Sequence, residues 1–209
     1  MRDDVELWCG TCVGCGSRKG PKNHPRAPLA TRRSGFPLHA VSVDLVAPLA
    51  RSNRCNKYIA VMTDYFTKWT EVYAMPHMEA ATVARKLVEE FICRYGALVE
   101  LHTDKGRQFD SKLLQKMCKL LEVWKTFTKP YHPQSDGLVE RFNRTLGAIT
   151  SQFVNMNHTN WNEKLAQVQL AYRSSLQETT KFTTHFLVFG RHVRLPVDVV
   201  FRRPKDDLY

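Results

Sequence analysis

The chain has 209 residues and a formal net charge of +11, from 31 lysines and arginines against 20 aspartates and glutamates. A hydrophobic content of 43% excludes a largely disordered protein. The sequence shows neither an apolar stretch of about 18 residues nor a secretory signal. We therefore expect a folded, intracellular protein with no membrane partner, whose excess charge marks either a polyanion-binding surface or a merely soluble one.

Three strands are predicted first. Residues 41–46 alternate between apolar and polar positions, so they predict a strand that ends before Pro48 and turns Asp44 away from its Val and Leu side chains. Residues 58–63 and 69–73 predict two further strands. Because short turns link these segments, we expect an antiparallel meander.

Helices and strands then alternate. Apolar spacing predicts a helix over 83–92 that stops at Gly96, a strand over 99–103, a helix over 113–121 capped by Asp110 or Ser111, and a strand over 123–127. A proline-bounded loop over 130–137 precedes a helix over 139–153, and another helix starts near 160. The order predicts an α/β fold with a mixed five-stranded sheet flanked by helices.

Three predicted elements each carry one acidic residue that a core does not need. Asp44 lies in the first strand, Asp104 follows the fourth, and Glu140 begins the helix after the loop. Alone, each has an ordinary structural explanation, such as a turn or a helix N-terminus. Carboxylates at the ends of adjacent strands repel one another unless a divalent cation neutralises them. Together they predict a metal-dependent phosphoryl-transfer site that acts on DNA or RNA.

The set Asp44, Asp104 and Glu140, with 35 residues between the last two, resembles the D,D(35)E triad of retroviral and long-terminal-repeat retrotransposon integrases. The words HTDKGRQF and PYHPQSDGLVERFNRTL resemble the Ty3/Gypsy type, and DYFTKW and FGRHVRLP extend the resemblance over nearly the whole chain. It implies a ribonuclease H-like fold, and a triad that binds two Mg²⁺ or Mn²⁺ ions. The implied reaction is 3′-end processing, then strand transfer of element DNA into target DNA.

The resemblance also implies DNA and further copies of the chain as partners, and a nuclear location, or a cytoplasmic one before integration. Candidate DNA contacts are His132 and Gln134 in the loop, Asn143 and Arg144 on the Glu140 face of the helix, and Lys105 beside Asp104. An ordinary connection and a solvated polar face are the alternatives. We interpret His102, Trp69 and Trp161 as structural residues.

Three N-terminal cysteines resemble half of a zinc module. Cys12 and Cys15 match the Cys pair of the family's His–His–Cys–Cys module, and Cys9 is additional. The paired histidines would precede Met1, and a closed zinc site needs four ligands. We therefore expect Zn²⁺ binding only if the module is completed.

The predicted organisation is a truncated zinc module (1–20), a linker (21–38), an integrase catalytic core (39–175) and a partly irregular extension of the core (176–209). The chain is then a fragment of a longer polyprotein or a domesticated copy. Two other functions stay open: DNA binding without catalysis, and nuclease activity on RNA–DNA hybrids.

Overall fold

The computed structural model describes residues 2–11, 34–46, 48–128, 142–147 and 159–201. Its contacts divide the chain into two compact units, Met1–Ala30 and Thr31–Tyr209. The first unit contains the helix α1 (Arg2–Thr11), whose first turn carries Asp3 and Asp4. Acidic side chains there stabilise a helix because they face the positive end of its dipole.

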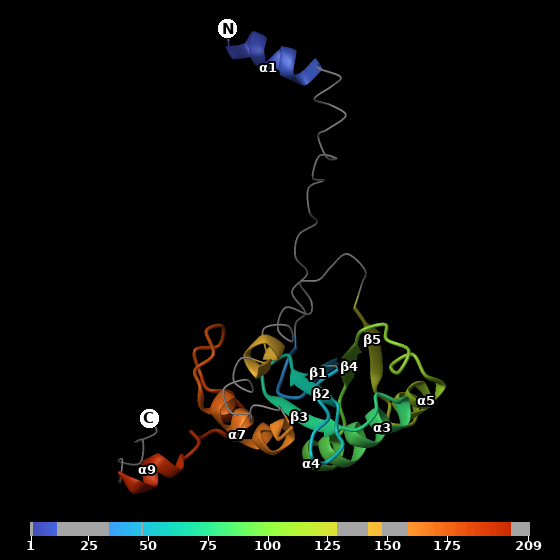
Figure 1. Ribbon diagram of the computed structural model, residues 1–209, viewed down its shortest axis with the longest axis vertical. Coiled ribbons are helices and arrows are strands. Elements are labelled where there is room, and N and C mark those ends of the chain that lie inside the picture. Colours follow the sequence, from blue (N-terminus) through green and yellow to red (C-terminus); the bar gives the residue numbers. More distant parts are fainter. Residues whose placement is uncertain (1, 12–33, 47, 129–141, 148–158, 202–209) are drawn as a thin grey trace. The chain divides into compact units, whose positions relative to one another are not determined.

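Five strands of the second unit form one mixed sheet in the order β3-β2-β1-β4-β5 (Figure 1). Antiparallel pairing joins β1 (Ala40–Val46) to β2 (Tyr58–Asp64), and β2 to β3 (Thr70–Met75). Parallel pairing joins β1 to β4 (Glu100–Thr103), and β4 to β5 (Trp124–Phe127). The predicted mixed five-stranded sheet is confirmed.

A single helical run connects β3 to β4. It consists of α3 (Ala80–Arg85), η1 (Lys86–Ile92) and α4 (Cys93–Tyr95), and the central segment η1 is π-helical. The predicted helix is confirmed, although its apolar spacing did not reveal the π-helical turns. The run ends at Gly96, whose φ of 92° lies in a region that glycine adopts without steric cost.

The helix α5 (Lys112–Leu120) connects β4 to β5. Ser111 is its N-cap, and the Ser111 side chain accepts a hydrogen bond from the backbone N–H of Leu114. Of the two predicted caps, the structure therefore selects Ser111.

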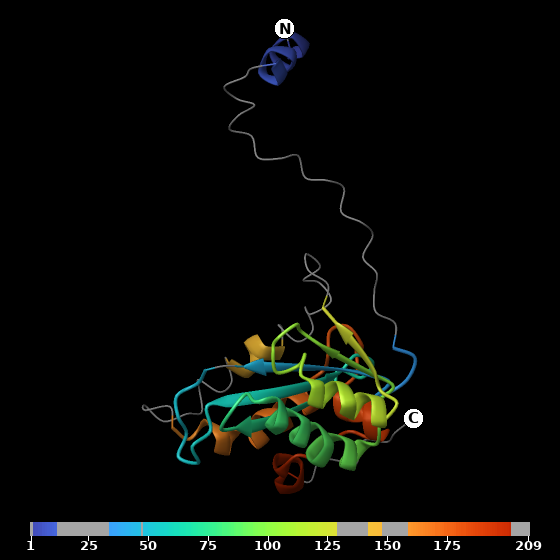
Figure 2. The same cartoon turned by 90° about the vertical axis from the view of Figure 1, so that its right-hand side faces the viewer.

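The sheet separates two hydrophobic clusters, so helices cover both of its faces (Figure 2). Val41, Val43 and Leu101 pack with buried residues of α3, η1 and α5. On the opposite face, Ile59, Val61 and Val72 pack with residues of the helical segment 142–147 and of α7 (Trp161–Ser174). Because side chains alternate along a strand, Asp44 belongs to this second face.

A buried ion pair joins α7 to the edge strand β3. Arg173 Nη2 lies 2.5 Å from Glu71 Oε1, and Glu71 is only 4% exposed. The same carboxylate oxygen accepts hydrogen bonds from Trp69 Nε1 and from the Tyr95 hydroxyl. Burial, and then the hydrogen bond to Glu71, raises the pKa of Tyr95 to about 12.

Two short helices complete the described chain. They are α8 (Thr184–Phe189) and α9 (Pro196–Val200). The Trp69 ring lies between the guanidinium of Arg173, 4.0 Å from its centroid, and the ring of Phe189. Trp69 and Trp161 are 3% and 2% exposed, which confirms both as packing residues. None of the helices in the described ranges is long and apolar enough to cross a membrane.

Candidate active site

The parallel pairing of β1 with β4 brings two of the predicted carboxylates together. They lie at the edge of the sheet that is formed by the carboxyl ends of these two strands. Val43 pairs with Thr103, so Asp44 and Asp104 are the next residues on neighbouring parallel strands. The carboxyl ends of parallel strands form a common site for ligands in α/β proteins. Asp44 is half-buried and Asp104 is exposed, so the edge is open to a ligand from solvent.

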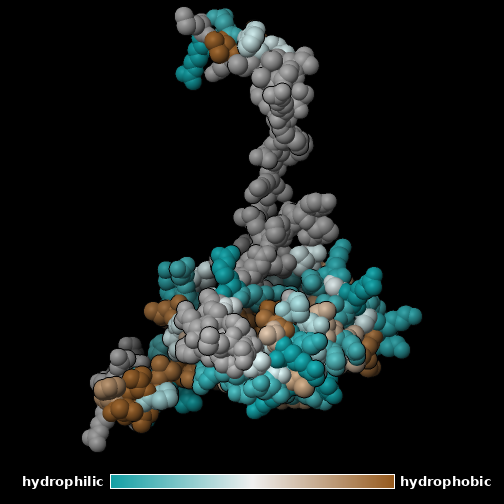
Figure 3. Space-filling model, in the orientation of Figure 1, coloured by the Kyte–Doolittle hydropathy of each residue, from teal (hydrophilic) through white to brown (hydrophobic). Residues whose placement is uncertain are grey.

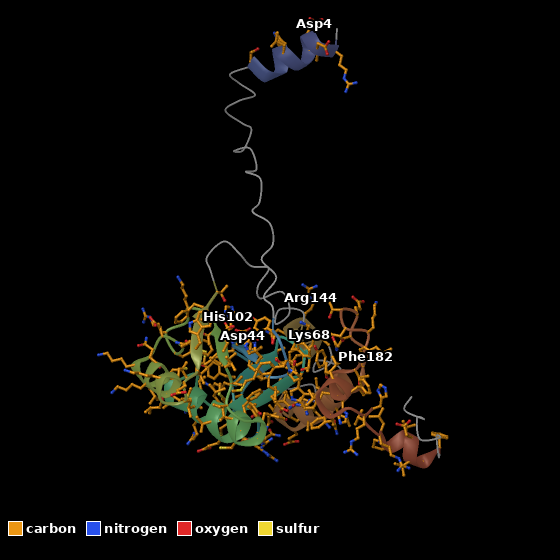
Figure 4. The ribbon with its side chains drawn as sticks, turned by 180° about the vertical axis from the view of Figure 1, so that it is seen from behind. Asp4, Asp44, Lys68, His102, Arg144 and Phe182 are labelled. Carbon is orange, nitrogen blue, oxygen red and sulfur yellow. The ribbon has the colours of Figure 1, made fainter. Side chains whose placement is uncertain are left out.

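Two hydrogen bonds from described residues orient Asp44. Its Oδ1 accepts the backbone N–H of Leu45 at 2.8 Å, and its Oδ2 accepts the side-chain amide of Asn143 at 2.7 Å. Figure 4 labels Asp44 on β1 and His102 on the adjacent strand β4, where His102 pairs with Ser42. A carboxylate with donors on both oxygens is restricted in its rotation, so Asp44 points in a defined direction.

Asn143 reaches Asp44 because its helical segment is anchored in the core. Phe142 and Leu146, four residues apart, are each 2% exposed and belong to the cluster with Ile59 and Trp161. The Oδ1 of Asn143 is buried and has no hydrogen-bond partner among the described residues. The predicted DNA contact thus uses its amide on Asp44.

Asp104 lies in a tight loop after β4. Its Oδ1 accepts the backbone N–H of Gly106 at 2.9 Å. A Cβ at position 106 would lie 2.3 Å from Gln108 Nε2 and 2.9 Å from Asp104 Oδ1, so a larger residue here would require the ends of these two side chains to move. Lys105 and Arg107 are exposed on either side of Gly106.

His102 holds β4 against β5. It is 4% exposed, and its ring nitrogens Nδ1 and Nε2 lie 2.9 Å and 3.3 Å from the hydroxyl oxygens of Thr126 and Thr128. The Thr126 hydroxyl donates to Glu100 at 2.7 Å. These contacts confirm His102 as a structural histidine, and they stabilise the strand that ends at Asp104.

Several predicted site residues lie outside the described ranges: Glu140, His132, Gln134, Cys12, Cys15 and the side chain of Cys9. Within the described ranges, no group of three or more His, Cys, Asp and Glu residues could hold a metal ion. The structure therefore describes two members of the predicted triad. Arg144 and Lys105 are exposed, as phosphate contacts would have to be.

The donor set at this edge fits a hard divalent cation. Mg²⁺ prefers oxygen ligands, and it usually binds one or two carboxylates together with water and substrate phosphates. Asp44 and Asp104 supply two such carboxylates, in β1 and directly after the neighbouring parallel strand β4. A structural zinc site would use thiolate and imidazole donors instead.

Sequence reasoning missed two features of this site. It placed Asn143 on the Glu140 face of a helix but did not predict its hydrogen bond to Asp44. The available signal was that Asn143 follows Glu140 by three residues, so both were expected on the same side of the helix. Sequence reasoning also did not single out Gly106, whose backbone N–H donates to Asp104.

Comparisons with known proteins agree with this geometry. Residues 37–133 match the profile of the integrase core domain family. The chain is 29% identical over 163 residues to the retrovirus-related Pol polyprotein from transposon 412 of Drosophila melanogaster, a match over 77% of this chain and 13% of the relative. It is 27% identical over 201 residues to Gypsy retrotransposon integrase-like protein 1 of Pongo abelii, a match over 94% of this chain and 37% of that relative.

A solved structure shares the fold. The HTLV-2 integrase catalytic core domain in complex with magnesium, in its trimeric form, superposes with a TM-score of 0.60 at 16% identity. The match covers 74% of this chain and 99% of that one. The predicted ribonuclease H-like fold is thereby confirmed.

The first three relatives are much longer than this chain, which spans between 13% and 37% of their length. The similarity nevertheless includes β1, which carries Asp44, and the loop after β4, which carries Asp104, since both lie within the matched segment. The chain is therefore similar, in residues 37–133, to the integrase core domain family, and over most of its length to the integrases of Gypsy-type retrotransposons and retroviruses.

Proposed function

We propose that this chain is an integrase catalytic core that performs metal-dependent polynucleotidyl transfer. It would process the 3′ ends of element DNA and then join them to a target strand. The observation that carries the proposal is the pair Asp44 and Asp104, which directly follow the last paired residues of the parallel strands β1 and β4, within a segment that matches the integrase core domain. The integrase names of its relatives and the magnesium in the HTLV-2 core support the same reaction class.

Asp44, Asp104 and Glu140 would hold the Mg²⁺ or Mn²⁺ ions. Bound there, the ions supply Lewis-acid stabilisation of the attacking and leaving oxygens of a phosphodiester. Asn143 and the Leu45 N–H orient Asp44, while the Gly106 N–H orients Asp104. The protein's part in the reaction is to keep these carboxylates in place, and no nucleophilic side chain is required.

The exposed cations near this edge would hold the DNA. Lys105 follows Asp104 directly and Arg144 follows Asn143, so both are placed to contact phosphates that flank the reacting one. A net charge of +11 favours such backbone contacts and makes them sensitive to salt. We further propose that the chain acts as a homo-oligomer on nuclear DNA, as the trimeric form of the HTLV-2 core suggests.

Strand joining on branched DNA substrates with Mn²⁺ or Mg²⁺ tests the proposal. Asp104→Asn should abolish the reaction, because the amide keeps an oxygen for the Gly106 N–H but loses the charge that binds the metal. The matched variant Asp110→Asn removes one exposed carboxylate six residues away and should retain activity.

Joining activity that survives Asp104→Asn would refute the catalytic assignment. If the unmodified chain binds DNA but shows no metal-dependent joining, the alternative of a catalytically silent DNA-binding protein is favoured instead. Cleavage of an RNA–DNA hybrid without joining would indicate the nuclease alternative.

A further inference from the structure

The exposed face of α5 carries a row of lysines. Lys112, Lys116 and Lys119 are all exposed, whereas Leu114 and Cys118 on the opposite side of the helix are 1% and 3% exposed. At about 100° per residue, the three lysines fall within about 60° around the helix axis. They therefore form one stripe at the centre of the outward face.

These lysines are not used in ion pairs. Within the described ranges, none of the three makes a salt bridge or a side-chain hydrogen bond. The helical run on the same face of the sheet differs, because Lys86 and Arg94 both pair with Glu90 there. The α5 sequence, KLLQKMCKL, contains no acidic residue. Its positive charge is therefore available to a partner.

The stripe continues from the candidate active site. The loop from Asp104 to α5 carries the exposed Lys105 and Arg107, which are also without a salt bridge among the described residues. Lys112 then opens the helix, and Lys119 lies about 10 Å further along its axis, a span of about three base pairs of duplex DNA. A duplex that passes the strand ends at Asp104 can thus extend along α5.

Two classes of partner have to be weighed, an acidic protein and a nucleic acid. Leu113 and Leu120 are 49% and 83% exposed beside the stripe, which would suit an acidic protein segment with an apolar side. Figure 3 shows hydrophilic and hydrophobic residues side by side at the right-hand edge of the molecule, where α5 lies, and hydrophilic residues predominate there. The lysines occupy the centre of the outward face and the leucines its margin, and the cations continue to the edge that would bind DNA. A nucleic acid fits this arrangement better.

We propose that α5 is a DNA-binding surface that contacts the phosphate backbone of the duplex engaged at the candidate active site, through Lys112, Lys116 and Lys119. The inference rests on the proposed function for its ligand, and it adds a surface outside the catalytic edge. Lysine contacts to phosphates give affinity without sequence specificity. The α5 surface therefore acts on any duplex sequence.

The test is a salt titration of duplex binding by the full chain, measured by fluorescence anisotropy in EDTA with a labelled duplex of random sequence. Lys112→Gln, Lys116→Gln and Lys119→Gln are combined in one variant, since glutamine has nearly the helix propensity of lysine. Each lost phosphate contact lowers the slope of log K against log salt by about 0.9. We expect a slope that is smaller by about 2 to 3, and a Kd at about 0.1 M salt that is 10-fold to 100-fold higher.

The control variant combines Lys181→Gln, Arg191→Gln and Arg194→Gln, three exposed cations in the segment around α8. It removes the same charge from the chain but leaves α5 intact, so its slope should change by less than about 1. Thermal unfolding of both variants verifies that they are folded.

Unchanged duplex binding by the α5 variant would overturn this inference alone and leave the stripe as a surface for an acidic protein. Equal effects of the two triple variants would also overturn it, because net charge would then explain the binding. Absence of duplex binding by the unmodified chain would overturn the inference together with the proposed function. If the unmodified chain shows no strand joining, but the α5 variant still has the smaller salt slope of duplex binding, only the proposed function is overturned.

Discussion

Asn143 donates a hydrogen bond to Asp44, from Nδ2 to Oδ2 over 2.7 Å, and so joins two residues that lie 99 positions apart in the sequence. The contact links the helical segment 142–147 to the strand β1. A neutral amide that donates to a carboxylate fixes its direction without adding charge to the site. Asn143 is therefore a positioning residue for Asp44.

Replacement of Asn143 by alanine should lower the rate of strand joining by about 10-fold to 100-fold, the usual cost of losing a residue that orients a metal ligand. The apparent Kd for Mn²⁺ should rise as well. Duplex binding in EDTA should be unchanged, since the amide is occupied by Asp44. Single-turnover joining assays over a range of Mn²⁺ concentrations measure both effects.

Arg144→Gln is the matched comparison, one residue further along the same helix. Its side chain is exposed, so we expect weaker duplex binding at an unchanged Mn²⁺ requirement. An Asn143→Ala variant that behaves like Arg144→Gln would show that Asn143 contacts DNA and does not position Asp44.

Gly106→Ala should reduce strand joining by at least about tenfold, because a displacement of a catalytic group by about 1 Å has effects of this size. The added methyl group would lie 2.9 Å from Asp104 Oδ1 and 2.8 Å from the Cδ of Gln108. Both neighbours are ends of flexible side chains that can move aside, so thermal stability should change little. Gln108→Ala in the same chain removes one of the two obstacles and should restore only part of the activity. Full restoration would mean that Asp104 had not been displaced.

Arg173→Leu should destabilise the fold by about 3 kcal/mol, because it leaves the buried carboxylate of Glu71 without a cation. Lys86→Leu provides the comparison. Glu90 is less buried and keeps its pairing with Arg94, so the loss should be below about 1 kcal/mol. Urea unfolding followed by tryptophan fluorescence measures both changes. Similar losses would show that burial does not determine the strength of the Glu71 pair.

The stability of the fold should decrease as pH rises from about 10 to about 12. An unfolded tyrosine ionises near pH 10, whereas the folded pKa of Tyr95 is raised to about 12. The protonated phenol is therefore favoured by folding, and its contribution is complete below pH 10 and lost as the folded group ionises. Tyr95→Phe should reduce this loss, as judged by urea unfolding midpoints across that range. Burial also raises the pKa of Tyr73, so part of the loss should remain.

Much of the fold follows from local patterns in the sequence. Alternation of Val41, Val43 and Leu45 with polar residues predicted β1 and the side on which Asp44 lies. The cap at Ser111 and the stop at Gly96 placed helix ends close to where they are found. The π-helical turns of η1 could not be predicted, because the packing of the whole helical run determines them.

The candidate site was predictable only in part. Asp104 and Asp44 were identified because they are acidic residues in or beside predicted strands, and a resemblance to a known family connected them to Glu140. The pairing of Val43 with Thr103 decides that they are neighbours, and no local pattern specifies which strands pair in parallel.

The sequence by itself determined the classes of element, the alternation that separates the two faces of the sheet, and the excess of positive charge, because these depend on residue type and spacing. Only the tertiary structure decided that Asn143 orients Asp44, that Glu71 binds Arg173, and that the lysines of α5 continue the basic surface from Asp104. The first two relationships join residues far apart in the chain, and all three depend on the sheet order and on the packing of the helices.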